Sequence, residues 1–154
     1  MQRYIKMRTK QNNSHFFLYY SRFAVPLHPQ NVIKMKDICC IGHVTKDKIV
    51  TPSSTVYMAG GTSFYFAYAI NQLPKDVSFS LITAMDPTEK EPVEKMLKAG
   101  IDVTLNPSRN TVFFENIYGN NPNDRKQRVL AKADPFTIQQ LEHVEAKVFH
   151  LGSL

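Results

Sequence analysis

The sequence contains no tryptophan, only two cysteines and only six glycines in 154 residues. The cysteines, Cys39 and Cys40, are adjacent in an apolar run, and neighbours on a strand point to opposite faces. They therefore cannot form an ordinary disulfide with each other, and they lack the spacing of metal ligands. We expect two buried thiols in a reducing compartment, and hence a cytoplasmic protein.

The few glycines exclude two common nucleotide-binding motifs. No Gly-Lys-Ser/Thr phosphate loop occurs anywhere in the chain. The first apolar run ends in "IGHVTKD", which does not supply the G-x-G-x-x-G of a nucleotide-binding oxidoreductase. An oxidoreductase of that type is therefore a poor fit to this sequence.

Acidic residues are absent from the first part of the chain, and long hydrophobic runs are absent throughout. Residues 1–34 carry six Lys or Arg and no acid, whereas residues 35–154 carry thirteen residues of each sign. The net charge of +6 therefore belongs to the N-terminal arm and not to a folded face, where a nucleic-acid footprint would lie. No apolar run approaches the roughly 20 residues of a membrane helix. We expect neither a nucleic-acid nor a membrane partner.

The N-terminal arm, residues 1–34, is basic and aromatic. Its apolar stretch "HFFLYYSRFAV" is interrupted by Ser21 and Arg22, which makes it too irregular for the core of a signal peptide. An organelle transit peptide would also lack acids, but the amphipathic pattern is poor. We expect translation to begin naturally at Met35. The arm is then an upstream extension, poorly ordered or loosely helical, without a function of its own.

The body, residues 35–154, alternates strand patterns with helix patterns, which predicts an α/β fold with a mostly parallel sheet. Residues 48–58 and 111–131 do not fit the alternation and predict a small β lid over one edge, its second part a hairpin turning at 120–124. The remaining strands are expected at 37–43, 76–86, 101–105 and 148–154, and the helices at 62–73, 86–100 and 134–147.

Polar residues at the predicted helix starts suggest side-chain caps. The expected caps are Thr62 or Ser63, Asp86 with Glu89 completing a capping box, and Asp134. The middle helix should stop at Gly100 and bury Val93, Met96 and Leu97.

A double glycine precedes the first predicted helix in "STVYMAGGTSFYFAYAINQL". Gly60 and Gly61 lack a Cβ, so a ligand can approach their backbone closely and a positive φ costs little. The following helix start offers free N–H groups and a positive dipole end. This arrangement could hold hydroxyl groups or an anion. A plain turn between strand and helix is the alternative, which the glycines alone favour, and it stays open.

The segment "GHVTKD" places Asp47 just after the first predicted strand. Ligands of open α/β sheets bind beyond the carboxyl ends of the strands. A carboxylate there can accept hydrogen bonds from neighbouring hydroxyls of a polyol. The alternative is a solvated loop aspartate.

The order and spacing of several pieces resemble the ribokinase-like, or PfkB, carbohydrate kinases. The resemblance covers roughly residues 36–154 and corresponds to about the first half of a family member. It implies a ribokinase-like Rossmann-type sandwich, present in part, with a small β lid over a sugar or nucleoside. The pieces are "DICCIGHVTKDKIV", "MAGGTSFYFAYAINQL", "SLITAMD", "LKAGIDVT", "NTVFFENIYG" and "VFHLGSL".

The resemblance also implies roles for single residues. Asp47 would contact an acceptor hydroxyl, and Gly60 and Gly61 would approach the acceptor through their backbone. Tyr65 stands where many relatives have an asparagine that bonds the sugar, which leaves the identity of the acceptor open. On the lid, Thr111 matches the threonine that opens the second strand, and Phe113 and Glu115 would face the pocket. Core packing is the alternative for Phe113. Arg125 or Arg128 could reach a phosphate or carboxylate of a substrate, or lie at a solvated hairpin tip.

Family members carry a later Gly-Ala-Gly-Asp motif, whose aspartate takes the proton from the acceptor hydroxyl. None of the six glycines here belongs to such a motif. We therefore expect an acceptor-binding half without catalytic or metal-binding residues, inactive alone. ATP and Mg²⁺ would serve only the full-length protein, and none is expected on this chain. The alternative is a non-catalytic module that pairs through its open sheet edge, as a homodimer or with a complementary half.

Overall fold

The computed structural model describes residues 17–20, 23–26, 35–74, 76–121 and 123–152. The chain divides into two compact units, Met1–Lys34 and Met35–Leu154. In the first unit, β1 (Phe17–Tyr20) and β2 (Phe23–Pro26) form an antiparallel pair. These two segments are strands where we expected disorder or loose helix, because aromatic and branched residues favour strands. The rest of the predicted arm lies outside the described residues.

The body sheet of the second unit has four parallel strands in the order β10-β3-β6-β7. The predicted parallel sheet is therefore confirmed. Its strands are β3 (Lys36–Ile41), β6 (Phe79–Met85), β7 (Val103–Pro107) and β10 (Ala146–Leu151). Both cysteines of β3 are free and fully buried, as expected from their apolar surroundings.

Two helices connect the strands of the body sheet, α1 (Thr62–Asn71) and α2 (Glu91–Lys98). Both crossovers step in the same direction across the sheet, so right-handed connections place both helices on one face. Their buried residues share one core with β3 and β6. This core includes Cys40, Ala67, Leu81, Met85, Val93 and Met96. Within the described ranges, no helix combines the length and the apolar content needed to cross a bilayer.

The helix ends agree with the sequence pattern only in part. Asp86 caps as expected, because its Oδ1 accepts a 2.8 Å hydrogen bond from the Thr88 N–H, but the helix it caps is the short 3₁₀ helix η1 (Pro87–Glu89). Helix α2 starts after Lys90 and stops before Gly100, which has the expected left-handed backbone with φ 84°.

Three expectations about helices are wrong. Helix α1 starts after Gly61 without a side-chain cap, so neither Thr62 nor Ser63 caps it. Glu89 completes no capping box, because its carboxylate bonds Lys46 instead. Leu97 is half exposed, whereas Val93 and Met96 are buried as predicted.

The last helix is also shorter than its sequence suggests. Helix α3 (Ile138–Leu141) begins at Thr137, which forms a capping box with Gln140. The predicted cap, Asp134, lies outside the helix, because its carboxylate bonds Arg109 in the loop after β7.

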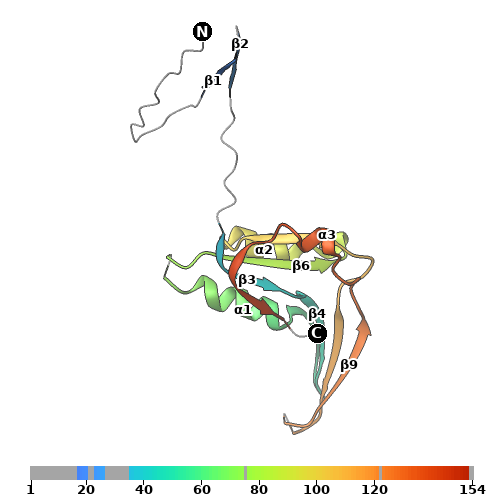
Figure 1. Ribbon diagram of the computed structural model, residues 1–154. Coiled ribbons are helices and arrows are strands. Elements are labelled where there is room, and N and C mark those ends of the chain that lie inside the picture. The colour runs from blue at the N-terminus through green and yellow to red at the C-terminus, as the bar shows by residue number, and fades with distance from the viewer. Residues whose placement is uncertain (1–16, 21–22, 27–34, 75, 122, 153–154) are drawn as a thin grey trace, which may run out of the picture. The chain divides into compact units, whose positions relative to one another are not determined.

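A second sheet, called the lid sheet from here on, has the order β5-β4-β8-β9. Strands β4 and β8 are parallel, and the two outer pairs are antiparallel. Figure 1 shows this sheet at the end of the body sheet where β3 and β6 finish. The predicted lid and its hairpin are therefore confirmed. Its strands are β4 (Thr45–Val50), β5 (Thr55–Gly60), β8 (Phe113–Tyr118) and β9 (Arg125–Ala131).

Candidate functional site

The carboxylate of Asp47 lies directly against the backbone of Gly60. The register of β4 and β5 pairs Thr45 with Gly60 and Asp47 with Met58, so the Asp47 side chain leans along the strand toward Gly60. A Cβ at position 60 would lie 2.5 Å from Asp47 Oδ2 and 2.9 Å from its Cγ. Real Cβ atoms essentially never come so close to another group, so a Cβ at position 60 would force the Asp47 carboxylate to shift.

A buried hydroxyl holds one oxygen of this carboxylate. Thr45 donates a 2.7 Å hydrogen bond from Oγ1 to Asp47 Oδ1, and Thr45 itself is 3% exposed. Within the residues that the structure describes, Asp47 Oδ2 accepts no hydrogen bond. An ionised carboxylate can accept several hydrogen bonds, so Oδ2 is available to a hydroxyl from outside the protein.

Gly61 makes the turn from β5 into α1. Its φ is 92°, a left-handed region that side-chain-bearing residues rarely adopt. A Cβ there would also lie 2.6 Å from the carbonyl oxygen of His43 and 2.9 Å from Thr45 Cγ2. The plain-turn interpretation therefore accounts for Gly61, whereas Gly60 leaves the space that the Asp47 carboxylate occupies.

Asp47 and Tyr65 line one cavity of about 590 Å³, the Asp47 cavity. Its volume falls within the roughly 300–1,000 Å³ of small-molecule sites. The structure brings these two predicted residues together, while Gly60 and Gly61 do not line the cavity; Gly60 lies against the Asp47 carboxylate. The other lining residues are Ile49, Thr51, Met58, Asn116, Tyr118, Gly119 and Arg125.

The register of β4 and β8 corrects the expectation for Phe113 and Glu115. Phe113 pairs with Lys46 and Glu115 with Lys48, and successive side chains of a strand point to opposite faces. Both residues therefore lie on the face of the lid sheet opposite Asp47 and do not face its cavity. Asn116 and Tyr118 of the same strand line the cavity instead.

Glu115 is held in an ion-pair cluster. It is 5% exposed, accepts a 3.0 Å hydrogen bond from Lys48 Nζ and bonds the Arg128 guanidinium through Oε2. Lys48, and after it Arg128, lowers the pKa of Glu115. Phe113 packs beside this cluster, with its ring 6.3 Å from that of Tyr57. The core-packing alternative for Phe113 agrees with this position.

Thr111 does not line the Asp47 cavity but a second cavity of about 290 Å³. Its side chain is buried, and Oγ1 accepts a 3.2 Å hydrogen bond from the Asp86 N–H. The same cavity is lined by Lys46 and Glu89, whose ion pair joins the lid sheet to η1, and Lys46 lowers the pKa of Glu89. Thr111 therefore positions the chain where the lid meets the body.

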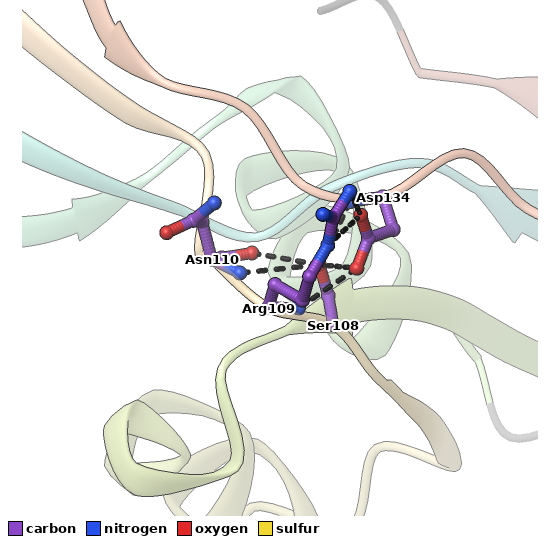
Figure 2. Close-up of polar contacts among 4 residues, drawn as sticks. All are labelled: Ser108, Arg109, Asn110 and Asp134. Atoms are coloured by element: carbon purple, nitrogen blue, oxygen red, sulfur yellow. Dashed lines mark hydrogen bonds and ion pairs between the residues drawn. The ribbon is translucent and has the colours of Figure 1, made fainter.

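A second polar cluster joins the end of β9 to the loop after β7 (Figure 2). Arg109 donates to Asp134 from its backbone N–H at 2.8 Å and from its guanidinium at 2.9 and 2.7 Å. The buried Ser108 Oγ accepts a 2.7 Å hydrogen bond from the Asp134 N–H and donates to the Asn110 carbonyl. Arg109 lowers the pKa of Asp134 to about 2.

The residues described offer no fit for the Mg²⁺ that the resemblance implies. They contain no group of three or more His, Cys, Asp or Glu side chains that could hold a metal ion. They also supply no glycine-rich phosphate loop.

No family model matches the sequence, and no curated protein matches it. Solved structures do resemble it. A pyrophosphate-dependent kinase in the ribokinase family, complexed with a pyrophosphate analog and myo-inositol, is 27% identical over 75% of this chain and 39% of its own, with a TM-score of 0.62. Two others share the fold at 17% identity. The match to Halothermothrix orenii fructokinase covers 75% of this chain and 45% of the fructokinase, with a TM-score of 0.58. The match to the Pyrococcus horikoshii sugar kinase PH1459, in complex with ATP, covers 67% of this chain and 37% of that kinase, with a TM-score of 0.53.

The body of the chain therefore resembles ribokinase-family kinases of the PfkB type, which confirms the resemblance seen in the sequence. Its fold is the ribokinase-like α/β fold. The chain spans about 40% of the length of ribokinase-family kinases that it matches.

The Arg109–Asp134 cluster predicts a pH-dependent contribution to stability. A carboxyl group that titrates near pH 4 when unfolded and near pH 2 when folded stabilises the native state above pH 4. This contribution is lost as the pH falls toward 2. Asp134→Asn should therefore lower the urea midpoint at pH 7, and the difference from wild type should shrink between pH 4 and pH 2.5. Asp124→Asn, an exposed change in the hairpin turn, is the control. A difference that is independent of pH would contradict this assignment.

Proposed function

We propose that residues 35–154 form the acceptor-binding part of a PfkB-type carbohydrate kinase. The complete protein would move a phosphoryl group, from ATP with Mg²⁺, to a hydroxyl of a sugar, nucleoside or related polyol. The observation that carries this proposal is the Asp47 carboxylate, which lines a cavity of suitable volume with one oxygen fixed and the other available. The structural likeness to sugar and inositol kinases supports it.

Asp47 acts in this proposal by positioning the acceptor. Because Thr45 fixes Oδ1, the carboxylate presents Oδ2 in one orientation, and an acceptor hydroxyl donates its hydrogen bond there. Ile49 and Met58 supply apolar wall, and Tyr65 supplies a ring and a hydroxyl where many relatives have an amide. Holding the reacting hydroxyl in one place is the main protein contribution to phosphoryl transfer.

Binding of small polyols tests the role of Asp47. Calorimetric titration of the chain with myo-inositol, D-fructose and inosine should reveal binding of at least one. Asp47→Asn should weaken that binding at least about tenfold, since a charge-assisted hydrogen bond contributes about 1.5–3 kcal/mol. Asp76→Asn, an exposed change far along the chain, should have no effect. The proposal is overturned if nothing on the panel binds, or if Asp47→Asn binds as tightly as wild type.

The chain by itself should not catalyse. It lacks the Gly-Ala-Gly-Asp motif that the resemblance places beside the transferred phosphoryl group, so no residue here takes the acceptor proton. Incubation with ATP, Mg²⁺ and the same polyols should therefore yield no phosphorylated product by ³¹P NMR. Clear turnover would refute the proposal that this chain binds the acceptor but lacks the catalytic residues.

A non-catalytic module is the second candidate, and the edge strand β10 favours it. Strand β10 pairs only with β3 among the described strands, and Val148, Phe149 and Leu151 are 56%, 47% and 73% exposed. Such an edge can pair with a second copy or with a complementary half. A chain that stays monomeric in light scattering at high concentration would argue against self-pairing.

A further inference from the structure

We propose that His43 positions the segment that carries Thr45 and Asp47, and that this segment opens when the imidazole takes up a proton. The Asp47 site is then complete at neutral pH and opens under mildly acidic conditions. The inference rests on the proposed function only for its consequence, which is the release of a bound acceptor. The opening itself is a property of the free chain.

The imidazole of His43 is buried without a polar partner. His43 is 7% exposed, and neither Nδ1 nor Nε2 has a hydrogen-bond partner within the described ranges. The centre of its ring lies 5.1 Å from that of Phe136, in the segment before α3. A neutral imidazole tolerates this environment better than an imidazolium, which would bring a charge and two N–H donors to a place without an acceptor.

The backbone beside this ring is held in place on both sides. The His43 carbonyl oxygen lies close to Gly61 at the start of α1, because a Cβ on Gly61 would come within 2.6 Å of it. The next residue, Val44, is fully buried and donates a 2.9 Å hydrogen bond from its N–H to Thr83 Oγ1 of β6. The imidazole therefore cannot reach solvent while this backbone keeps its contacts.

The Asp47 site follows directly along the chain. Thr45 lies two residues after His43 and donates the hydrogen bond that fixes the Asp47 carboxylate. Between them, the Lys46 N–H donates a 2.9 Å hydrogen bond to the Val112 carbonyl. Displacing the His43 ring from its buried position thus displaces the stretch that orients the carboxylate.

No charged group within the described part of the chain compensates a proton on His43. Helix α1 and strand β6 contain no Asp, Glu, Lys, Arg or His. The segment before α3 carries Lys132 and Asp134, and the Asp134 carboxylate is bonded by Arg109. Burial is the cause that lowers the pKa of His43, without a contribution from these groups. The titratable side chains of β10, which pairs with β3, are Lys147 and His150.

The direction of the pH effect follows from this burial. An exposed histidine titrates near pH 6.5, whereas burial holds the pKa of His43 below that value in the closed segment. The open segment therefore binds a proton that the closed segment does not. As the pH falls below 6.5, the ratio of open to closed segment rises, by up to about tenfold per pH unit.

Amide hydrogen exchange on the full chain measures this opening directly. The reporters are the N–H groups of Val44 and Lys46, whose hydrogen bonds break when the segment opens. After correction for the intrinsic exchange rate, their protection should fall about tenfold between pH 7.5 and pH 5.5. The Leu81 N–H, bonded to the Asp102 carbonyl away from this segment, should change less than about threefold because the opening is local.

Substitution of His43 tests whether this residue is the group that takes up the proton. His43→Phe keeps an aromatic ring beside Phe136 and cannot be protonated, so the protection of both reporters should no longer depend on pH over this range. His43→Leu repeats the test with a smaller side chain. His143→Gln is the control, because the His143 side chain is 83% exposed, and this variant should keep the tenfold fall.

The wild type alone can overturn the inference. It is wrong if the two reporters are equally protected at both pH values, if the fall begins only below about pH 5, where carboxyl groups titrate, or if Leu81 loses as much protection. A fall that survives in a His43 variant also contradicts it. The exchange measurement needs no ligand. If the exchange depends on His43 but no polyol binds, the opening stands and the proposed function fails.

Discussion

The close approach between the Asp47 carboxylate and the Gly60 backbone is the constraint on which the site depends. It requires that β5 end in a residue without a Cβ, and that β4 and β5 keep the register that sets Thr45 opposite Gly60. The Thr45 hydroxyl reaches the carboxylate from the same strand, two residues before Asp47. Gly61 then turns the chain into α1, with its own Cβ position occupied by the His43 carbonyl. The two adjacent glycines therefore have separate roles: Gly60 leaves space for the carboxylate, and Gly61 makes the turn into α1.

The lid sheet divides its two faces between stability and binding. On one face, Glu115 joins β4 to β9 through Lys48 and Arg128, and Lys46 joins the lid to the body through Glu89. On the other face, Asp47, Tyr118 and Arg125 line a cavity. Because the ion pairs that hold the strands together lie on the first face, the second can present a carboxylate and a guanidinium without pairing them. Charge that is not used for folding is available for a ligand.

The fold was predictable because its signals are local. Alternating strand and helix patterns gave the parallel sheet, and the strand patterns outside that alternation gave the lid. In the candidate site, the sequence singled out Asp47 and the glycine pair, and the structure places Asp47 against Gly60. Their role in binding an acceptor stays a prediction. Phe113 and Glu115 were assigned to the wrong face because the parity of β8 depends on its register with β4, which local sequence does not encode. Asp134 was taken for a helix cap because its partner, Arg109, lies 25 residues away. Asn116 and Tyr118 were not predicted to line the cavity, because the sequence did not show which face of β8 points toward Asp47.

A double-mutant cycle between positions 47 and 60 tests the central claim most directly. Gly60 has no positive φ, so alanine fits its backbone and acts only by displacing the carboxylate. Affinity for the polyol that the wild type binds best would be measured for Gly60→Ala, Asp47→Asn and the double variant. If Gly60 serves Asp47, each single change weakens binding and the double variant is no weaker than the worse single one. Wild-type affinity in Gly60→Ala, or fully additive losses in the double variant, would contradict the account.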